Sequence, residues 1–196
     1  MENLLALLPA ALAMMASPGP VTLASAGFGA AYGLRAARLV LIMTAGTATI
    51  ILMVATGMLG LLTALPGAAP VLMTASGAYI LYLAWKIWTA PPVARADTTT
   101  QMPAALGVYA MALANPKAYA AMGALFSGFP LIEGDPLSNA IVKSVVLICF
   151  ATTVNLTWMS FGTALAIRLS SPATSAMLNR VFAVLLVLSV AGMALL

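Results

Sequence analysis

Six long apolar segments dominate this sequence of 196 residues. A helix needs about 20 consecutive apolar residues to cross the hydrocarbon core of a bilayer. Residues 4–31 and 104–132 exceed the length of one upright spanning helix, because such a run extends about 42 Å at 1.5 Å per residue. The sequence therefore predicts an all-α integral membrane protein with six transmembrane helices, over residues 4–31, 39–65, 70–89, 104–132, 140–167 and 177–196.

Charged side chains are scarce, and most of them alternate by sign between the connections. They make up 6% of the chain, against about 25% in soluble domains. One set of connections and helix ends carries Arg35, Arg38, Lys86, Arg95, Arg168 and Arg180 against Asp97. The other carries Glu2, Glu133 and Asp135, with Lys143 near its edge. Because basic loops stay in the cytoplasm, we expect both termini in the periplasm and the connection 90–103 in the cytoplasm.

Helix-breaking residues interrupt the two longest segments near their middles. Proline removes a backbone donor from a helix and clashes with the preceding turn. The interruptions are Pro18, Gly19 and Pro20 in the first segment and Asn115, Pro116 and Lys117 in the fourth. Two halves with three helices each have opposite orientations, and broken helices at matching places are typical of transporter sites. We therefore expect an inverted 3+3 repeat in one membrane domain, with halves at 1–95 and 104–196 and a linker at 96–103.

The first break is a candidate substrate site. After Pro18, Gly19 and Pro20, a new half-helix begins with free amides and a positive dipole end, which suit a carboxylate. Thr22 adds a hydroxyl donor on this half-helix. The alternative is a packing kink that neighbouring helices satisfy.

The second break adds a buried charge. Inserting a lysine at mid-membrane costs about 2.5–3.5 kcal/mol, and a substrate anion at Lys117 would offset that cost. Lys117 could instead bind the carbonyls that a break leaves free. Asn115 could bind those carbonyls or orient a substrate amine. Both interpretations of Asn115-Pro116-Lys117 stay open.

Two polar residues of the fifth segment share a helix face. Asn155 and Trp158 are three positions apart, a spacing that puts both side chains on one side. They could line the substrate cavity, or Asn155 could hydrogen-bond a neighbouring helix. We expect the single cysteine, Cys149, to be a small core residue.

Several function classes are excluded by residue types. The chain has no histidine and one cysteine, which argues against metal sites, cofactors, thiol oxidoreductases and hydrolases, so we expect no enzyme. No nucleic acid is expected as a partner. Proton carriers usually keep an acid or histidine in the membrane, but no Asp or Glu lies inside the six segments. Proton coupling through Lys117 is therefore a hypothesis.

Together these motifs resemble the lysine exporter (LysE/RhtB) family of bacterial amino-acid exporters. The resemblance covers nearly the whole chain and rests on 17–20, Gly33 with Arg35 and Arg38, 77–83, 115–118, 129–130, Trp158 and 179–181. It implies a multi-pass secondary transporter of the bacterial inner (plasma) membrane that exports an amino acid or close derivative. It also implies proton coupling and a small homo-oligomer such as a homodimer.

Two departures from the family pattern bear on the substrate. Val21 stands where many members carry a polar residue, and Ala36 and Ala37 dilute the basic loop. With no membrane acid to pair a cationic side chain, we favour a neutral amino acid bound near the midplane by alternating access. The alternatives are an uncoupled small-solute channel or uniporter, a metal-resistance pump lacking its expected ligands, and a structural subunit that leaves Lys117 unexplained.

Overall fold

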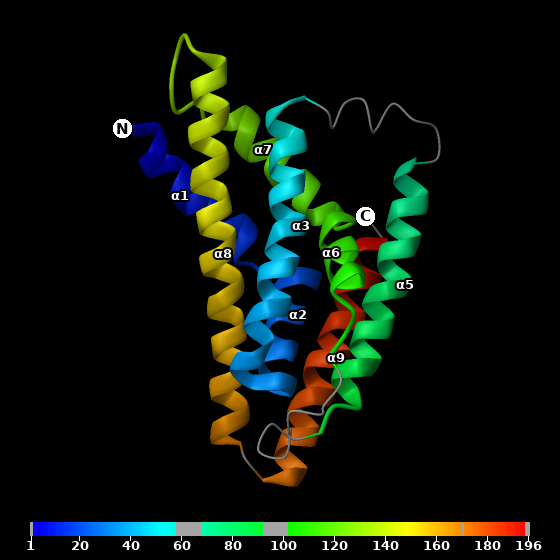
Figure 1. The fold of residues 1–196 in the computed structure, drawn as a ribbon. Helices are drawn as coiled ribbons and strands as arrows, with labels where there is room; N and C mark the ends of the chain where they lie inside the picture. The colour runs from blue at the N-terminus through cyan, green and yellow to red at the C-terminus, as the bar shows by residue number, and fades with distance from the viewer. Residues whose placement is uncertain (1, 58–67, 92–101, 170, 195–196) are drawn as a thin grey trace.

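The computed structural model describes residues 2–57, 68–91, 102–169 and 171–194, and its regular elements in these ranges are helices (Figure 1). The all-α prediction is confirmed for this part of the chain. Pro20–Ala55 and Pro136–Arg168 are each long and apolar enough to cross a membrane. The helices are α1 (Glu2–Met15), α2 (Pro20–Tyr32), α3 (Ala37–Ala55), α5 (Ala68–Trp88), α6 (Ala105–Leu113), α7 (Pro116–Gly128), α8 (Pro136–Arg168) and α9 (Pro172–Ala194), with a short 3-10 helix η1 (Gly33–Ala36) between α2 and α3.

Prolines set the starts of α2 and α7. Pro20 and Pro116 occupy the first helical positions, where a missing N–H costs nothing because that group has no helical partner. Each of these helices has 13 residues. Helix α7 ends at Gly128, so the last part of the apolar segment 104–132 is not helical. Pro130 explains that end, since the residue before a proline is disfavoured in helical conformation.

Helix α2 lies at the centre of the bundle. Every residue from Pro20 to Tyr32 is buried, as expected for a helix that is apolar all round. Small residues let it approach α8 closely. A Cβ at Gly29 would collide with the Met159 carbonyl, and one at Gly162 would collide with the Ala26 carbonyl. The Thr163 hydroxyl also donates to the Gly29 carbonyl at 3.1 Å.

Helix α7 is packed much less completely than α2. One face contributes Ala118, Ala121, Met122 and Leu125 to a second apolar cluster with α1 and α3. At Gly123 a Cβ would meet no heavy atom within 4 Å. The two half-helices that follow the breaks therefore occupy unequal environments.

The two ends of the bundle carry opposite charges. Helix α8 begins at the cap residue Asp135 and ends at Arg168, and its 33 residues extend about 50 Å. The end of α8 lies with the end of α5 and the start of α9 (Figure 1), so Lys86 and Arg180 lie near that end too. The loop with Glu133 lies at the opposite end. The predicted linker 96–103 falls mostly outside the described residues.

One prediction about packing is wrong. Cys149 is exposed on α8, not buried in the core. In a bundle that faces lipid, the outer surface is as apolar as the interior, so an apolar segment does not specify which face turns inward.

Candidate functional site

Lys117 reaches from the start of α7 to the break between α1 and α2. Its ammonium donates to the Ser17 carbonyl at 2.6 Å and to the Ser17 hydroxyl at 2.8 Å. The Pro18 carbonyl is 3.4 Å away. Hydrogen bonds to a charged group contribute about 1.5–3 kcal/mol each, so two short ones offset the insertion cost of about 2.5–3.5 kcal/mol. The lysine thus binds carbonyls that the helix break leaves free.

Gly19 makes this approach possible. A Cβ there would lie 3.0 Å from the Lys117 Cδ and 3.1 Å from its Nζ, which is tighter than ordinary van der Waals contact. The lysine therefore passes directly over a residue that has no side chain. Pro18 and Pro20 flank this passage and hold the backbone out of the helix.

Other side chains satisfy the rest of the first break. The Trp158 indole N–H donates to the Ala16 carbonyl at 3.1 Å, and the Ser17 hydroxyl donates to the Met14 carbonyl at 3.1 Å. The Gly19 N–H donates to the Thr22 hydroxyl at 2.9 Å, and that hydroxyl lies 3.1 Å from the Gly19 carbonyl. Thr22 is therefore a local cap, and its hydroxyl is already engaged. Trp158 therefore binds the backbone of the first break directly.

Asn115, at the second break, has an unpartnered acceptor. It is the N-cap residue of α7 but makes no side-chain cap bond. The residue is 5% exposed, and its Oδ1 is buried without a hydrogen-bond partner. Such an atom costs about 1–3 kcal/mol unless a donor from outside the chain binds it. Asn155, by contrast, donates to the Thr44 hydroxyl at 3.1 Å and so joins α8 to α3.

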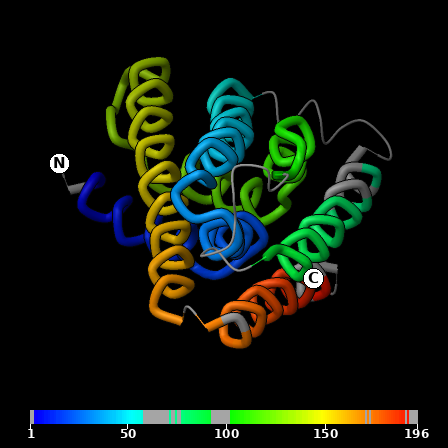
Figure 2. The backbone as a smooth tube through the Cα atoms, turned by 60° about the horizontal axis from the view of Figure 1, so that its bottom comes forward, coloured from blue at the N-terminus to red at the C-terminus, as the bar shows by residue number. Residues whose placement is uncertain are grey.

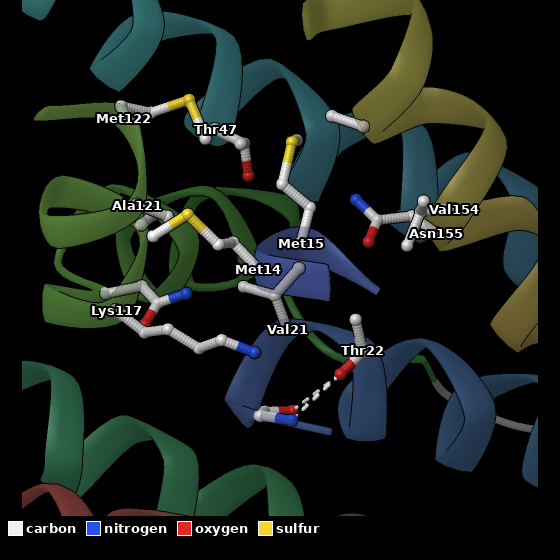
Figure 3. Close-up of a pocket in the computed structure, with 14 residues that line it drawn as sticks. Met14, Met15, Val21, Thr22, Thr47, Lys117, Ala121, Met122, Val154 and Asn155 are labelled. Carbon is white, nitrogen blue, oxygen red and sulfur yellow. Dashed lines mark hydrogen bonds between the residues drawn. The ribbon is translucent and has the colours of Figure 1, made fainter. Parts of the chain in front are cut away.

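A small cavity of about 50 Å³ lies between the two breaks. That volume exceeds the roughly 10–15 Å³ that a cavity needs to hold a water molecule. Figure 3 shows Lys117 extending toward the start of α2, with the sulfur atoms of Met14, Met15 and Met122 in the same pocket. Of the predicted site residues, the lining includes Gly19, Thr22, Asn115, Lys117 and Asn155. Pro18, Pro20, Pro116 and Trp158 shape or satisfy the breaks without lining the cavity.

Sequence reasoning missed several residues here. Ser17 supplies two of the three Lys117 contacts, and its position next to Pro18 was the available signal. Met14, Met15 and Met122 line the cavity, but apolar residues in an apolar helix give no such signal. In the described ranges, His, Cys, Asp and Glu side chains form no group that could hold a metal ion.

A comparison with protein-family models matches residues 12–196 to the LysE type translocator. The chain belongs to the LysE type translocator family. The resemblance drawn from the sequence motifs is confirmed, and the family is one of membrane translocators rather than enzymes. No curated protein and no solved structure matches the chain.

The translocator buries a second lysine away from the cavity. Lys143 of α8 is completely buried, and its ammonium donates to the Phe126 carbonyl at 2.9 Å. It also lies 5.2 Å from the centre of the Phe126 ring. A cation near a helix C-terminus is favourable, and Phe126 is in the last turn of α7. Lys143 therefore has a structural partner and does not face the breaks.

Proposed function

We propose that this LysE type translocator exports a neutral amino acid or close derivative across the bacterial inner membrane, with its basic end in the cytoplasm and both termini in the periplasm. One observation carries the proposal. A lysine ammonium and an unpartnered amide oxygen, from Lys117 and Asn115, border the same small cavity between two helix breaks. An amino acid carries the two complementary groups, a carboxylate and an ammonium.

The carboxylate is received by Lys117 and the start of α2. The Lys117 ammonium has three N–H donors. When one of them bonds a substrate carboxylate in place of a neutral backbone carbonyl, the hydrogen bond becomes stronger. Pro20 has no N–H, so the free amides at the start of α2 belong to Val21 and Thr22. Their position at the positive end of the helix dipole favours the same anion.

The substrate ammonium is received by the Oδ1 of Asn115. This acceptor has no donor among the described residues. Asn155, which also lines the cavity, bonds Thr44 through its amide N–H, and its Oδ1 offers the substrate ammonium a second acceptor. The remaining walls include Met14, Met15 and Met122. A flexible, polarizable methionine surface adapts to apolar shapes, which supports a neutral side chain over a cationic one.

Alternating access is supported by the unequal packing of α2 and α7. Both have 13 residues and begin at a proline, as expected of equivalent half-helices in an inverted repeat. Yet α2 is wholly buried, while Gly123 of α7 faces open space. We propose that the two half-helices exchange these environments during transport. The small cavity also favours a discrete site over the alternative of a continuous, uncoupled channel.

Proton coupling is proposed to run through Lys117, and a homodimer is the proposed assembly. Arginine cannot release its proton in the working range. Lys117→Arg should therefore uncouple export from the proton gradient in proteoliposomes. Export by Lys117→Arg at the normal gradient-dependent rate would remove Lys117 as the carrier.

The direct test is an export assay in cells loaded with single amino acids. Lys117→Ala should strongly reduce export of the transported compound. Lys86→Ala, which removes a lysine outside the cavity, should leave export unchanged at equal protein level. If Lys117→Ala exports every tested compound as well as the wild type, the proposed role of Lys117 is wrong.

A further inference from the structure

A second hollow lies on the outside of the bundle, away from the breaks. It is a groove of about 410 Å³ between α5 and α9, two helices that lie side by side at one edge of the molecule (Figure 2). Its lining is apolar and includes Leu81, Trp85, Trp88, Val184, Val187 and Leu188. In a membrane protein, an exposed apolar surface of this kind is suited to contact with lipid chains.

The groove covers about two thirds of the length of an acyl chain within one leaflet. From Leu81 to Trp88 it extends about 10 Å along α5 at 1.5 Å per residue. One leaflet contributes about 15 Å of the 30 Å hydrocarbon core. The groove begins at the basic end of the bundle, where Trp85 and Trp88 are 59% and 46% exposed. Tryptophans so exposed at a helix end are typical of the membrane interface.

A cation stands at the same end of the groove. The Arg180 guanidinium lies 5.4 Å from the centre of the Trp88 ring, and Val184 of the groove wall is one helical turn further along α9. Arg180 is exposed and makes no ion pair within the described ranges. A guanidinium offers five donors that match phosphate geometry. Lys86, in the last turn of α5, adds a second positive charge near that end.

A hydrogen bond joins the two helices at the basic end of the groove. The Asn179 amide donates to the Ala90 carbonyl at 3.0 Å, which ties α9 to the residues after α5. This bond holds the backbone next to Arg180 beside the end of α5. We propose that this groove binds one anionic phospholipid, with its phosphate at Arg180 and an acyl chain along α5 and α9. Basic pockets between helices on the cytoplasmic side are known to suit such headgroups.

The experiment is native mass spectrometry of the purified protein with phosphatidylglycerol or phosphatidylcholine of identical acyl chains. The wild type should retain phosphatidylglycerol preferentially. Arg180→Gln should weaken it about five-fold, the effect of one basic residue at an anionic surface. Arg168→Gln, which removes a charge at the same end outside the groove, should change nothing. Transport is not measured, so the result is independent of the proposed function.

A second pair of variants tests the acyl chain. Val184→Trp should fill the groove and reduce binding of both lipids, while Val181→Trp, on the lipid-facing surface outside it, should not. Equal retention of both lipids by the wild type, or equal effects of Arg180→Gln and Arg168→Gln, would overturn the proposal. Loss of a dimer in Val184→Trp, with lipid binding unchanged, would assign the groove to a second copy of the chain. If Val184→Trp fails to fold, the effect of the surface substitution Arg180→Gln on phosphatidylglycerol binding tests the proposal.

Discussion

The Lys117 ammonium lies 2.6 Å from the carbonyl oxygen of Ser17, a residue one hundred positions earlier in the chain. This bond joins the start of α7, which follows the second break, to the backbone of the first break. Any movement that separates the two breaks must therefore break this hydrogen bond, and the ammonium then needs another acceptor. A substrate carboxylate is a stronger acceptor for the ammonium than a carbonyl, so substrate binding and release of the first break would be coupled at one atom.

Trp158→Phe should lower the stability of the folded protein. The substitution keeps most of the aromatic surface but removes the N–H that donates to the Ala16 carbonyl. An unpaired acceptor left inside the bundle costs about 1–3 kcal/mol. Thermal unfolding in detergent measures the effect, with Trp85→Phe as the control because Trp85 is exposed and lies away from the helix break. Equal unfolding midpoints for the two variants would mean that the break does not need this donor.

Alanine at the glycines of the α2–α8 contact should be strongly unfavourable. A Cβ at Gly29 or Gly162 would meet the backbone carbonyl of the other helix, and overpacking of this kind costs about 1–3 kcal/mol. Gly123→Ala should have no cost and could gain up to about 1 kcal/mol in helix propensity, because that site is open. Unfolding midpoints of the three variants give the ranking. If Gly123→Ala were the most damaging, the packing described for α2 and α7 would be wrong.

Asn115→Leu should stabilise the protein and impair export together. The change removes a buried acceptor that has no partner, a gain of about 1–3 kcal/mol, and no cap bond is lost. It also removes the proposed partner of the substrate ammonium. The two readouts are the unfolding midpoint and the KM for export. A variant that is more stable and transports normally would leave Asn115 without a role in binding.

Asp135 should make the stability of the folded protein depend on pH in the acidic range. The side-chain hydrogen bond from Ser138, with backbone N–H bonds from Ser138 and Leu137, holds the pKa of its carboxyl below the ordinary value of 3.8. A lowered folded-state pKa means that the stabilisation is present above about pH 4 and is lost as pH falls through the folded pKa.

The measurement is unfolding of the wild type and Asp135→Asn between pH 6 and pH 3. The wild type should be more stable at pH 6, and the difference should shrink toward pH 3. Other carboxylates titrate in both proteins, so the difference isolates Asp135. A constant difference across this range would show that its ionisation does not stabilise the cap.

Local signals in the sequence were sufficient for the elements but not for their contacts. Proline acts on its own backbone, so Pro20 and Pro116 mark where α2 and α7 begin. The partners of Lys117 depend on how two distant segments pack, and the sequence left two interpretations open. Its ammonium binds freed carbonyls in this structure.

The faces of the helices were equally hard to predict. Cys149 was expected in the core and is exposed, since hydrophobicity does not distinguish lipid from interior. Asn155 was assigned two possible roles, and its N–H bonds Thr44 of another helix. Met122 had no signal at all, although it lines the cavity. Which apolar residues surround a site is decided by packing alone.

Discrimination between an amino acid and its amide tests the central claim most directly. Export of the transported amino acid and of its carboxamide would be compared in proteoliposomes, for the wild type and Lys117→Met. A carboxylate bound by Lys117 predicts a wild-type preference for the acid of about ten-fold to a hundred-fold, the range of a hydrogen bond to a charged group. The preference should be much weaker in Lys117→Met, where only the Val21 and Thr22 amides at the start of α2 remain to bind the carboxylate. An equally strong preference in both proteins would contradict binding of the carboxylate by Lys117.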